Sequence, residues 1–259
     1  MDDLILTLRG LATVGLVLLL ILLRLDAERF GAAEYDERAR DGRSPALLRR
    51  LAWYVVGFGL VAAAALIHPA VATDLFLSLG DRTGAILDGL AYAAVGIAQA
   101  IAFAGLRYHH LRLPDVRSYP GSVINVIGTA FIDEATFRGL FLGYLVFIGV
   151  DGTTANVIQA LVYTLTTRVA APGRDRYMLV LVLVIGLGSG WVTLHTGGIG
   201  AAFLGHAVTR LAVFLATGHA GQPAVRGRET EDIERRQETP DGWSVVGVQD
   251  ASSQEERLG

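Results

Sequence analysis

The chain contains no cysteine and no lysine, and only 18% of its residues are charged. The absence of cysteine excludes disulfides, iron–sulfur clusters, thiolate zinc sites and cysteine nucleophiles. The absence of lysine excludes Schiff-base chemistry and phosphate-binding loops that depend on lysine. Soluble domains carry about 25% charged residues. The low charge, with 52% hydrophobic residues and a mean hydropathy of +0.46, therefore excludes an ordinary soluble enzyme, a disordered chain and a fibrous protein. A net charge of -3 indicates no nucleic-acid partner.

The sequence contains long apolar runs with few charged residues. A membrane-spanning helix needs about 20 mostly apolar residues, and seven segments qualify, although the fourth contains charges and the fifth is short and polar. These segments are 4–25, 51–71, 85–106, 122–150, 156–169, 178–194 and 199–217. We therefore expect an all-α, polytopic membrane helix bundle of about seven transmembrane helices.

The organisation of the chain follows from these runs and from the charged stretches between them. The first run has neither a basic start nor a small-residue cleavage site, so we expect 1–25 to be a retained N-terminal anchor. We further expect a charged cytoplasmic linker at 26–50 and a polytopic membrane domain at 51–217. The segment 218–259 is rich in Glu, Arg, Gln and Ser, which predicts a disordered cytoplasmic tail.

The arginines predict the orientation in the membrane, because short cytoplasmic loops are enriched in basic residues. Seventeen of the 22 arginines lie in 26–50, 107–121, 168–176 and the tail, and only Arg82 lies in the opposite loops. This distribution predicts a cell-membrane protein with its N-terminus outside and its C-terminus in the cytoplasm. Membrane lipid is then an expected partner.

The candidate chemistry lies in the fourth segment, where Asp133, Glu134 and Arg138 interrupt an apolar run. Ionisable residues inside a membrane are costly and usually functional. Glu134 and Arg138 are four residues apart, so they share a helix face and can pair. Two adjacent carboxylates with an arginine one turn later can form an acid–base site that activates water. The same residues could equally form a neutral ion-pair cluster that holds helices together.

The seventh segment adds His206, with Arg210 four residues later on the same face. An intramembrane histidine can polarise a carbonyl oxygen or carry a proton. We expect His206 to lie within one water's reach of Asp133 or Glu134. Zinc accepts the nitrogen and oxygen ligands of such a group, but only one histidine is in reach. We therefore expect no cofactor, while a divalent metal stays open.

The fifth segment carries polar residues at helical spacing, and we expect this stripe to face the bundle interior, where it could line a water-filled cleft or bond across helices. Its members are Asn156, Gln159, Tyr163, Thr166 and Thr167. Glycines are concentrated around the sixth and seventh segments, which favours close helix packing. The run Thr196-Gly197-Gly198 predicts the turn between them.

The run from Asp133 to Gly139 resembles the Glu-Glu-x-x-x-Arg signature of the CAAX-protease and bacteriocin-processing family (CPBP, also called Abi). The later run Gly186-x-x-x-Gly190-Trp191-x-x-x-x-Thr196-Gly197, followed by His206, resembles that family's third and fourth conserved stretches. The resemblance covers about 120–215. It implies peptide-bond hydrolysis by a glutamate-activated water, with Asp133 and Glu134 as the water-activating carboxylates, Arg138 as their organiser and His206 as an electrophilic helper.

Three positions depart from the family pattern: Asp133 stands where a glutamate is expected, Thr167 where a histidine is expected, and Arg210 where an asparagine is expected. The resemblance still makes an intramembrane endopeptidase acting on a membrane-associated peptide or protein the leading function. The alternatives are a catalytically inactive family member that serves as a membrane scaffold or immunity factor, and a small transporter. The sequence does not indicate the substrate or the oligomeric state.

Overall fold

The structure is a computed structural model that describes residues 2–27, 29–30, 32, 45–108, 110–114, 120–170, 176–217 and 243–247. Helices dominate the described residues, as the sequence predicts. They are α1 (Asp2–Leu25), α2 (Pro45–Ile67), α3 (Val71–Asp74), α4 (Arg82–Tyr108), α5 (Pro120–Glu134), η2 (Ala135–Phe141), α6 (Leu142–Phe147), α7 (Gly152–Ala170), α8 (Arg176–Thr196) and α9 (Gly200–Thr217). Two short strands, β1 (His110–Pro114) and β2 (Trp243–Gly247), complete the described elements.

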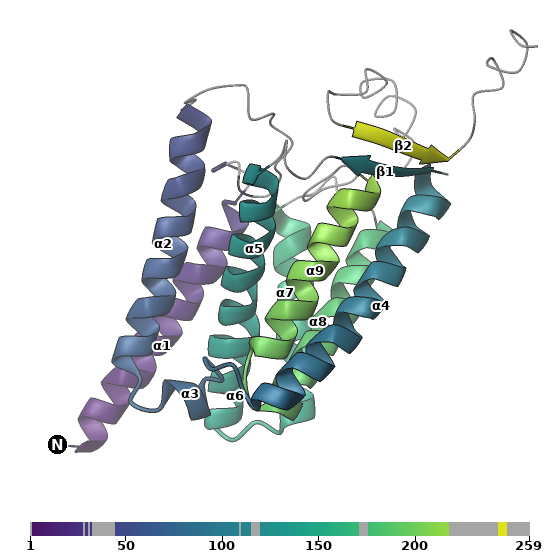
Figure 1. Ribbon diagram of the computed structural model, residues 1–259. Coiled ribbons are helices and arrows are strands. Elements are labelled where there is room, and N and C mark those ends of the chain that lie inside the picture. Colours follow the sequence, from purple (N-terminus) through teal and green to yellow (C-terminus); the bar gives the residue numbers. More distant parts are fainter. Residues whose placement is uncertain are drawn as a thin grey trace, which may run out of the picture.

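Five of these helices are long and apolar enough to cross a membrane, which makes the chain an integral, polytopic membrane protein. The five candidate spans lie in α1, α2, α4, α8 and α9. The predicted segments 122–150 and 156–169 are also helical, as α5–η2–α6 and α7, and stand beside the others in the bundle (Figure 1). Both carry the polar residues that the sequence singles out, and those residues lower their hydropathy.

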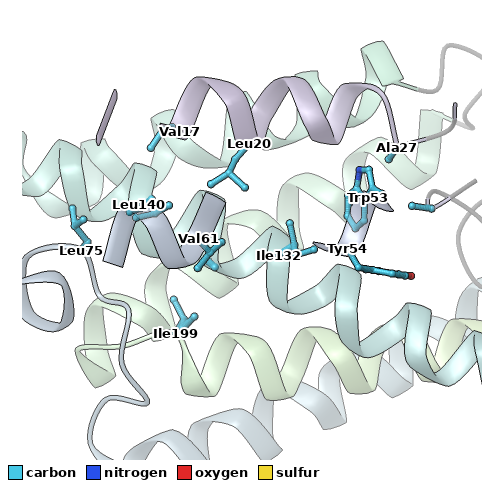
Figure 2. Packing of buried hydrophobic residues seen from close by; sticks show 13 residues of the cluster. Val17, Leu20, Ala27, Trp53, Tyr54, Val61, Leu75, Ile132, Leu140 and Ile199 are labelled. Atoms are coloured by element: carbon cyan, nitrogen blue, oxygen red, sulfur yellow. The ribbon is translucent and has the colours of Figure 1, made fainter. Parts of the chain in front are cut away.

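The helices pack as pairs of neighbours, and η2 contacts α1, α2, α7 and α8. Helix α1 lies beside α2, α7 beside α8, and α9 beside α4 (Figure 1). The indole nitrogen of Trp53 on α2 donates a hydrogen bond of 2.8 Å to the carbonyl of Leu23 at the end of α1. A buried apolar cluster connects α1 and α2 to α5 and η2, with Leu20, Ile132 and Leu140 among its members (Figure 2).

Helices α4 and α9 approach so closely that two glycines are required between them. A Cβ atom on Gly205 of α9 would overlap the ring of Tyr92 on α4. A Cβ atom on Gly96 of α4 would overlap the side chain of Thr209 on α9. Small residues allow such close approach in membrane bundles, and this pair of glycines brings α9, which carries His206, against α4.

The turn between α8 and α9 is confirmed at 197–199, with Gly197 at a φ of 71°. The segment 75–81 packs against this turn: the backbone nitrogen of Ile199 donates to the carbonyls of Phe76 (3.1 Å) and Ser78 (3.0 Å). At the start of α7, the side chain of Asp151 caps the helix. Hydrogen bonds from the Thr154 hydroxyl and from the backbone nitrogens of 153 and 154 lower the pKa of Asp151.

The only β-structure among the described residues is the antiparallel pair of β1 and β2, at the opposite end of the bundle from the N-terminus of the chain (Figure 1). In its register, Leu111 lies opposite Val246 and Leu113 opposite Ser244. Strand β2 belongs to the segment 218–259, which we expected to be disordered. The rest of that segment, and most of the linker 26–50, lie outside the described residues.

Candidate active site

The carboxylate of Glu134 is the centre of the candidate site. Its Oε1 atom lies 2.6 Å from Nδ1 of His206 on α9, and its Oε2 atom lies 3.4 Å from Nε of Arg138. Glu134 and Arg138 are fully buried, and His206 is 4% exposed. The expected proximity of the fourth and seventh segments, and the expected pairing of Glu134 with Arg138, are both confirmed.

Arg138 lies in η2, a seven-residue π-helical stretch inside an otherwise α-helical rod. The residues at both ends of η2, Glu134 and Leu142, have right-handed helical dihedral angles, so the rod continues through it. Single π turns inside α-helices are frequent at functional sites. The guanidinium carbon of Arg138 lies 4.3 Å from the centre of the Tyr163 ring on α7. The terminal nitrogens Nη1 and Nη2 make no hydrogen bond within the described residues, and the guanidinium lies over the ring face of Tyr163, where a cation is attracted to the ring.

Asp133 makes a contact that the sequence reasoning missed. Its Oδ1 atom lies 2.8 Å from Nε of Arg24, in the last turn of α1, and both side chains are buried. Arg24 was noticeable only as an arginine inside an apolar span. The carboxylate of Asp133 therefore faces α1, whereas the carboxylate of Glu134 faces α9.

Two of the positions that depart from the family pattern differ in burial: Thr167 on α7 is buried, and Arg210 on α9 is half-buried. Arg210 lies one turn after His206 on α9 and interacts electrostatically with Asp133. Arg24 contacts Asp133 directly.

Two hydroxyl groups connect Glu134 to α4 and α8. The Oγ atom of Ser189 on α8 lies 3.5 Å from Oε1 of Glu134. The hydroxyl of Tyr92 on α4 lies 2.8 Å from Oγ of Ser189 and 3.1 Å from the backbone carbonyl of Ile185. Neither hydroxyl was singled out from the sequence, because one serine and one tyrosine in apolar helices carry no motif.

The polar stripe of α7 faces inward as expected, since all five members are buried. Its amides bond across to α8: Asn156 donates to the carbonyl of Leu187 (3.0 Å), and Gln159 donates to that of Gly186 (2.8 Å). A Cβ atom on Gly190 would overlap the Asn156 side chain. In the described structure these two amides join helices α7 and α8.

The arrangement can act on a proton. A carboxylate and an imidazole at 2.6 Å share one proton readily, and together they form a unit that can accept a proton and return it. Among the described residues, no group of three or more His, Cys, Asp or Glu side chains is arranged to hold a metal ion. His195 lies apart from this unit, exposed at the end of α8, where its ring stacks on Trp191.

One comparison with known proteins matches the part of the chain that contains most of this site. Residues 115–212 match the family described as type II CAAX prenyl endopeptidase Rce1-like. The matched region contains Asp133, Glu134, Arg138 and His206, whereas Arg24 and Tyr92 lie outside it. No curated protein and no solved structure matches the chain. Residues 115–212 are thus a domain of the Rce1-like family of type II CAAX prenyl endopeptidases.

Proposed function

We propose that the protein is an intramembrane endopeptidase that hydrolyses a peptide bond of a membrane-associated peptide or protein. The observation that carries this proposal is the buried contact of 2.6 Å between Oε1 of Glu134 and Nδ1 of His206. A buried carboxylate beside an imidazole supplies the general base that an attacking water needs. The family match supports membrane proteins as the substrate class.

In the proposed reaction, Glu134 takes a proton from water as the water oxygen bonds to the carbonyl carbon. Nδ1 of His206 faces the Glu134 carboxylate, so the proton between them lies on Nδ1 while the carboxylate accepts. When the ring is protonated at Nε2 as well, that nitrogen donates to the carbonyl oxygen as negative charge develops there. Collapse of the tetrahedral intermediate breaks the carbon–nitrogen bond, and the proton held by Glu134 passes to the leaving amine.

The other two predicted site residues take supporting roles in this proposal. Arg138 lies 3.4 Å from Oε2 of Glu134 and orients the carboxylate. Asp133 was expected to share in water activation. Because Oδ1 of Asp133 lies 2.8 Å from Arg24, we assign the base to Glu134, and we assign to Asp133 the task of holding α1 against the start of η2.

Replacing Glu134 tests the proposed base. We expect Glu134→Gln to lower the rate of peptide hydrolysis at least about 100-fold, the lower scale for loss of a general base. The assay uses purified protein and a panel of membrane peptides that includes a prenylated C-terminal peptide. Asp88→Asn is the matched control, since Asp88 is a partly exposed carboxylate on α4 beside His195, and it should leave the rate unchanged. Equal hydrolysis by wild type and Glu134→Gln would refute the assignment.

A second candidate function, a non-catalytic family member, is favoured by a specific observation. The carboxylate of Asp133 is paired with Arg24, and Thr167 and Arg210 replace the histidine and asparagine that the family resemblance leads us to expect. Such a cluster is suited to holding helices together. It predicts no hydrolysis by the wild-type protein on any peptide of the panel, together with a loss of stability in Glu134→Gln.

We further propose that α5–η2–α6 and α7 cross the membrane with the five apolar helices, so that the N-terminus lies outside and the C-terminus in the cytoplasm. The buried polar residues of these two segments face other helices, which allows segments of lower hydropathy to cross. The arginine-rich segments 107–121 and 168–176 would then both lie in the cytoplasm, as the positive-inside rule requires.

Cysteine labelling tests this orientation, because the chain has no native cysteine. We expect cysteines placed at Ser44 and Ser252 to resist an impermeant thiol reagent on intact cells and to react after the cells are opened. A cysteine at Thr153, in the exposed first turn of α7, is the positive control and should react on intact cells. Reaction of only one of the two cytoplasmic positions on intact cells would contradict the seven crossings.

A further inference from the structure

The hydroxyls of Tyr92 and Ser189 form a chain of contacts that ends on Glu134. Tyr92 lies on α4 and Ser189 on α8, and neither helix carries a predicted site residue. Tyr92 Oη lies 2.8 Å from Ser189 Oγ, and Ser189 Oγ lies 3.5 Å from Glu134 Oε1. Ser189 is fully buried. Tyr92 belongs to α4, which lies outside the region that matches the family.

We propose that Tyr92 is a positioning residue of this site, which acts through Ser189 to present a hydroxyl donor to the Glu134 carboxylate. The effect on catalysis rests on the proposed function, since it treats Glu134 as the base. The existence of a hydroxyl chain that ends on Oε1 of Glu134 does not depend on that function.

The helices are shaped to hold the Tyr92 ring in this place. A Cβ atom on Gly205 would overlap the ring, and a Cβ atom on Gly188 would lie 3.6 Å from it. The ring therefore passes between α9 and α8 at positions where neither helix has a side chain. Because Gly205 precedes His206, the same close packing positions both the tyrosine and the histidine.

Counting hydrogens explains how the chain would respond to the charge of Glu134. Each hydroxyl has one hydrogen to donate and can also accept. If Tyr92 donates to the Ile185 carbonyl, Ser189 donates to Tyr92, and Oε1 receives nothing from Ser189. If Tyr92 donates to Ser189 instead, Ser189 donates to Oε1. The second arrangement places a donor on an ionised carboxylate, where a hydrogen bond is about twice as strong as one between neutral groups.

The infrared spectrum of Glu134 tests the chain without any need for activity. Subtracting the spectrum of the Glu134→Gln protein isolates the carboxyl bands of Glu134, and Glu134→Asp is the reference if the glutamine variant does not fold. We expect Tyr92→Phe and Ser189→Ala to shift the same Glu134 band in the same direction, and the double variant to shift it no further. A band unchanged in Tyr92→Phe would overturn the proposal.

Two matched controls remove hydroxyls that lie elsewhere. Tyr144→Phe removes a tyrosine hydroxyl on α6, and Thr193→Val removes a buried hydroxyl one turn after Ser189 on α8. Neither should move the Glu134 band. A shift of equal size in Thr193→Val would show a general response to hydroxyl loss on α8, and would also overturn the proposal.

Hydrolysis gives the catalytic readout. With the prenylated peptide we expect Tyr92→Phe and Ser189→Ala each to lower kcat about tenfold with KM unchanged, the size expected for one hydrogen bond to a charged group. Ser189→Thr keeps the hydroxyl and should retain most of kcat. Equal kcat in Tyr92→Phe and wild type would overturn the positioning role. If wild type hydrolyses nothing, the proposed function fails, while the infrared result still decides whether the hydroxyl chain exists.

Discussion

Replacing Arg24 with glutamine should destabilise the folded bundle by about 3–5 kcal/mol, the range for removing one partner of a buried ion pair. Arg24 Nε lies 2.8 Å from Asp133 Oδ1, and both side chains are buried, at 7% and 1% exposure. Without the guanidinium, Asp133 is a buried carboxylate that has lost its contact cation. Thermal or denaturant unfolding in detergent measures the effect.

A second variant separates the charge pair from the shape of the site. In Arg24→Gln combined with Asp133→Asn neither charge remains, so we expect most of the lost stability to return. Arg9→Gln is the matched control on the same helix, because Arg9 is exposed, and it should not lower stability. If Arg24→Gln and Arg9→Gln unfold at the same temperature or denaturant concentration, the contact between Arg24 and Asp133 contributes nothing to the stability of the bundle.

Gly205→Ala should destabilise the bundle by about 3 kcal/mol, at the upper end of the usual cost of overpacking. The new methyl group would overlap the ring of Tyr92 near its point of attachment, where the side chain cannot move aside easily. Helices α4 and α9 must then separate, or the tyrosine must leave the space between α9 and α8. Unfolding in detergent again provides the measurement.

A glycine in open surroundings provides the comparison. Gly59 of α2 has no atom within 4 Å of an added Cβ. Gly59→Ala should therefore stabilise its helix by about 0.5–1 kcal/mol, because alanine loses less backbone entropy. Adding Tyr92→Ala to Gly205→Ala should cost less than the sum of the two single changes. Additive costs would contradict a collision between residues 92 and 205.

The helices could largely be predicted from the sequence because their signals are local. Apolar runs of sufficient length located the five candidate spans, and Pro69 explains why α2 ends at Ile67, two residues earlier. The packing of the segment 75–81 on the α8–α9 turn, and the pairing of β1 with β2, could not be predicted. Both depend on partners more than 100 residues apart in the chain, and short segments carry no pattern that selects such partners.

Some contacts of the candidate site could likewise be predicted from the sequence, and others could not. The contact between Glu134 and Arg138 follows from a four-residue spacing within one helix, and His206 stood out as a polar residue in an apolar run. The partner of Asp133 depends on where α1 crosses α5, so spacing along the chain could not identify Arg24. The π-helical stretch at Arg138 and the close packing around Tyr92 are likewise products of tertiary packing.

The position of Arg24 has a consequence for how the chain is made. The helical rod α5–η2–α6 carries Asp133, Glu134 and Arg138 and is not among the helices apolar enough to cross a membrane by composition. Synthesis runs from the N-terminus, so α1, with Arg24 in its last turn, is complete before Asp133 is added. The cation that Asp133 contacts is thus already part of the chain before the segment that carries Asp133 and Glu134 is made.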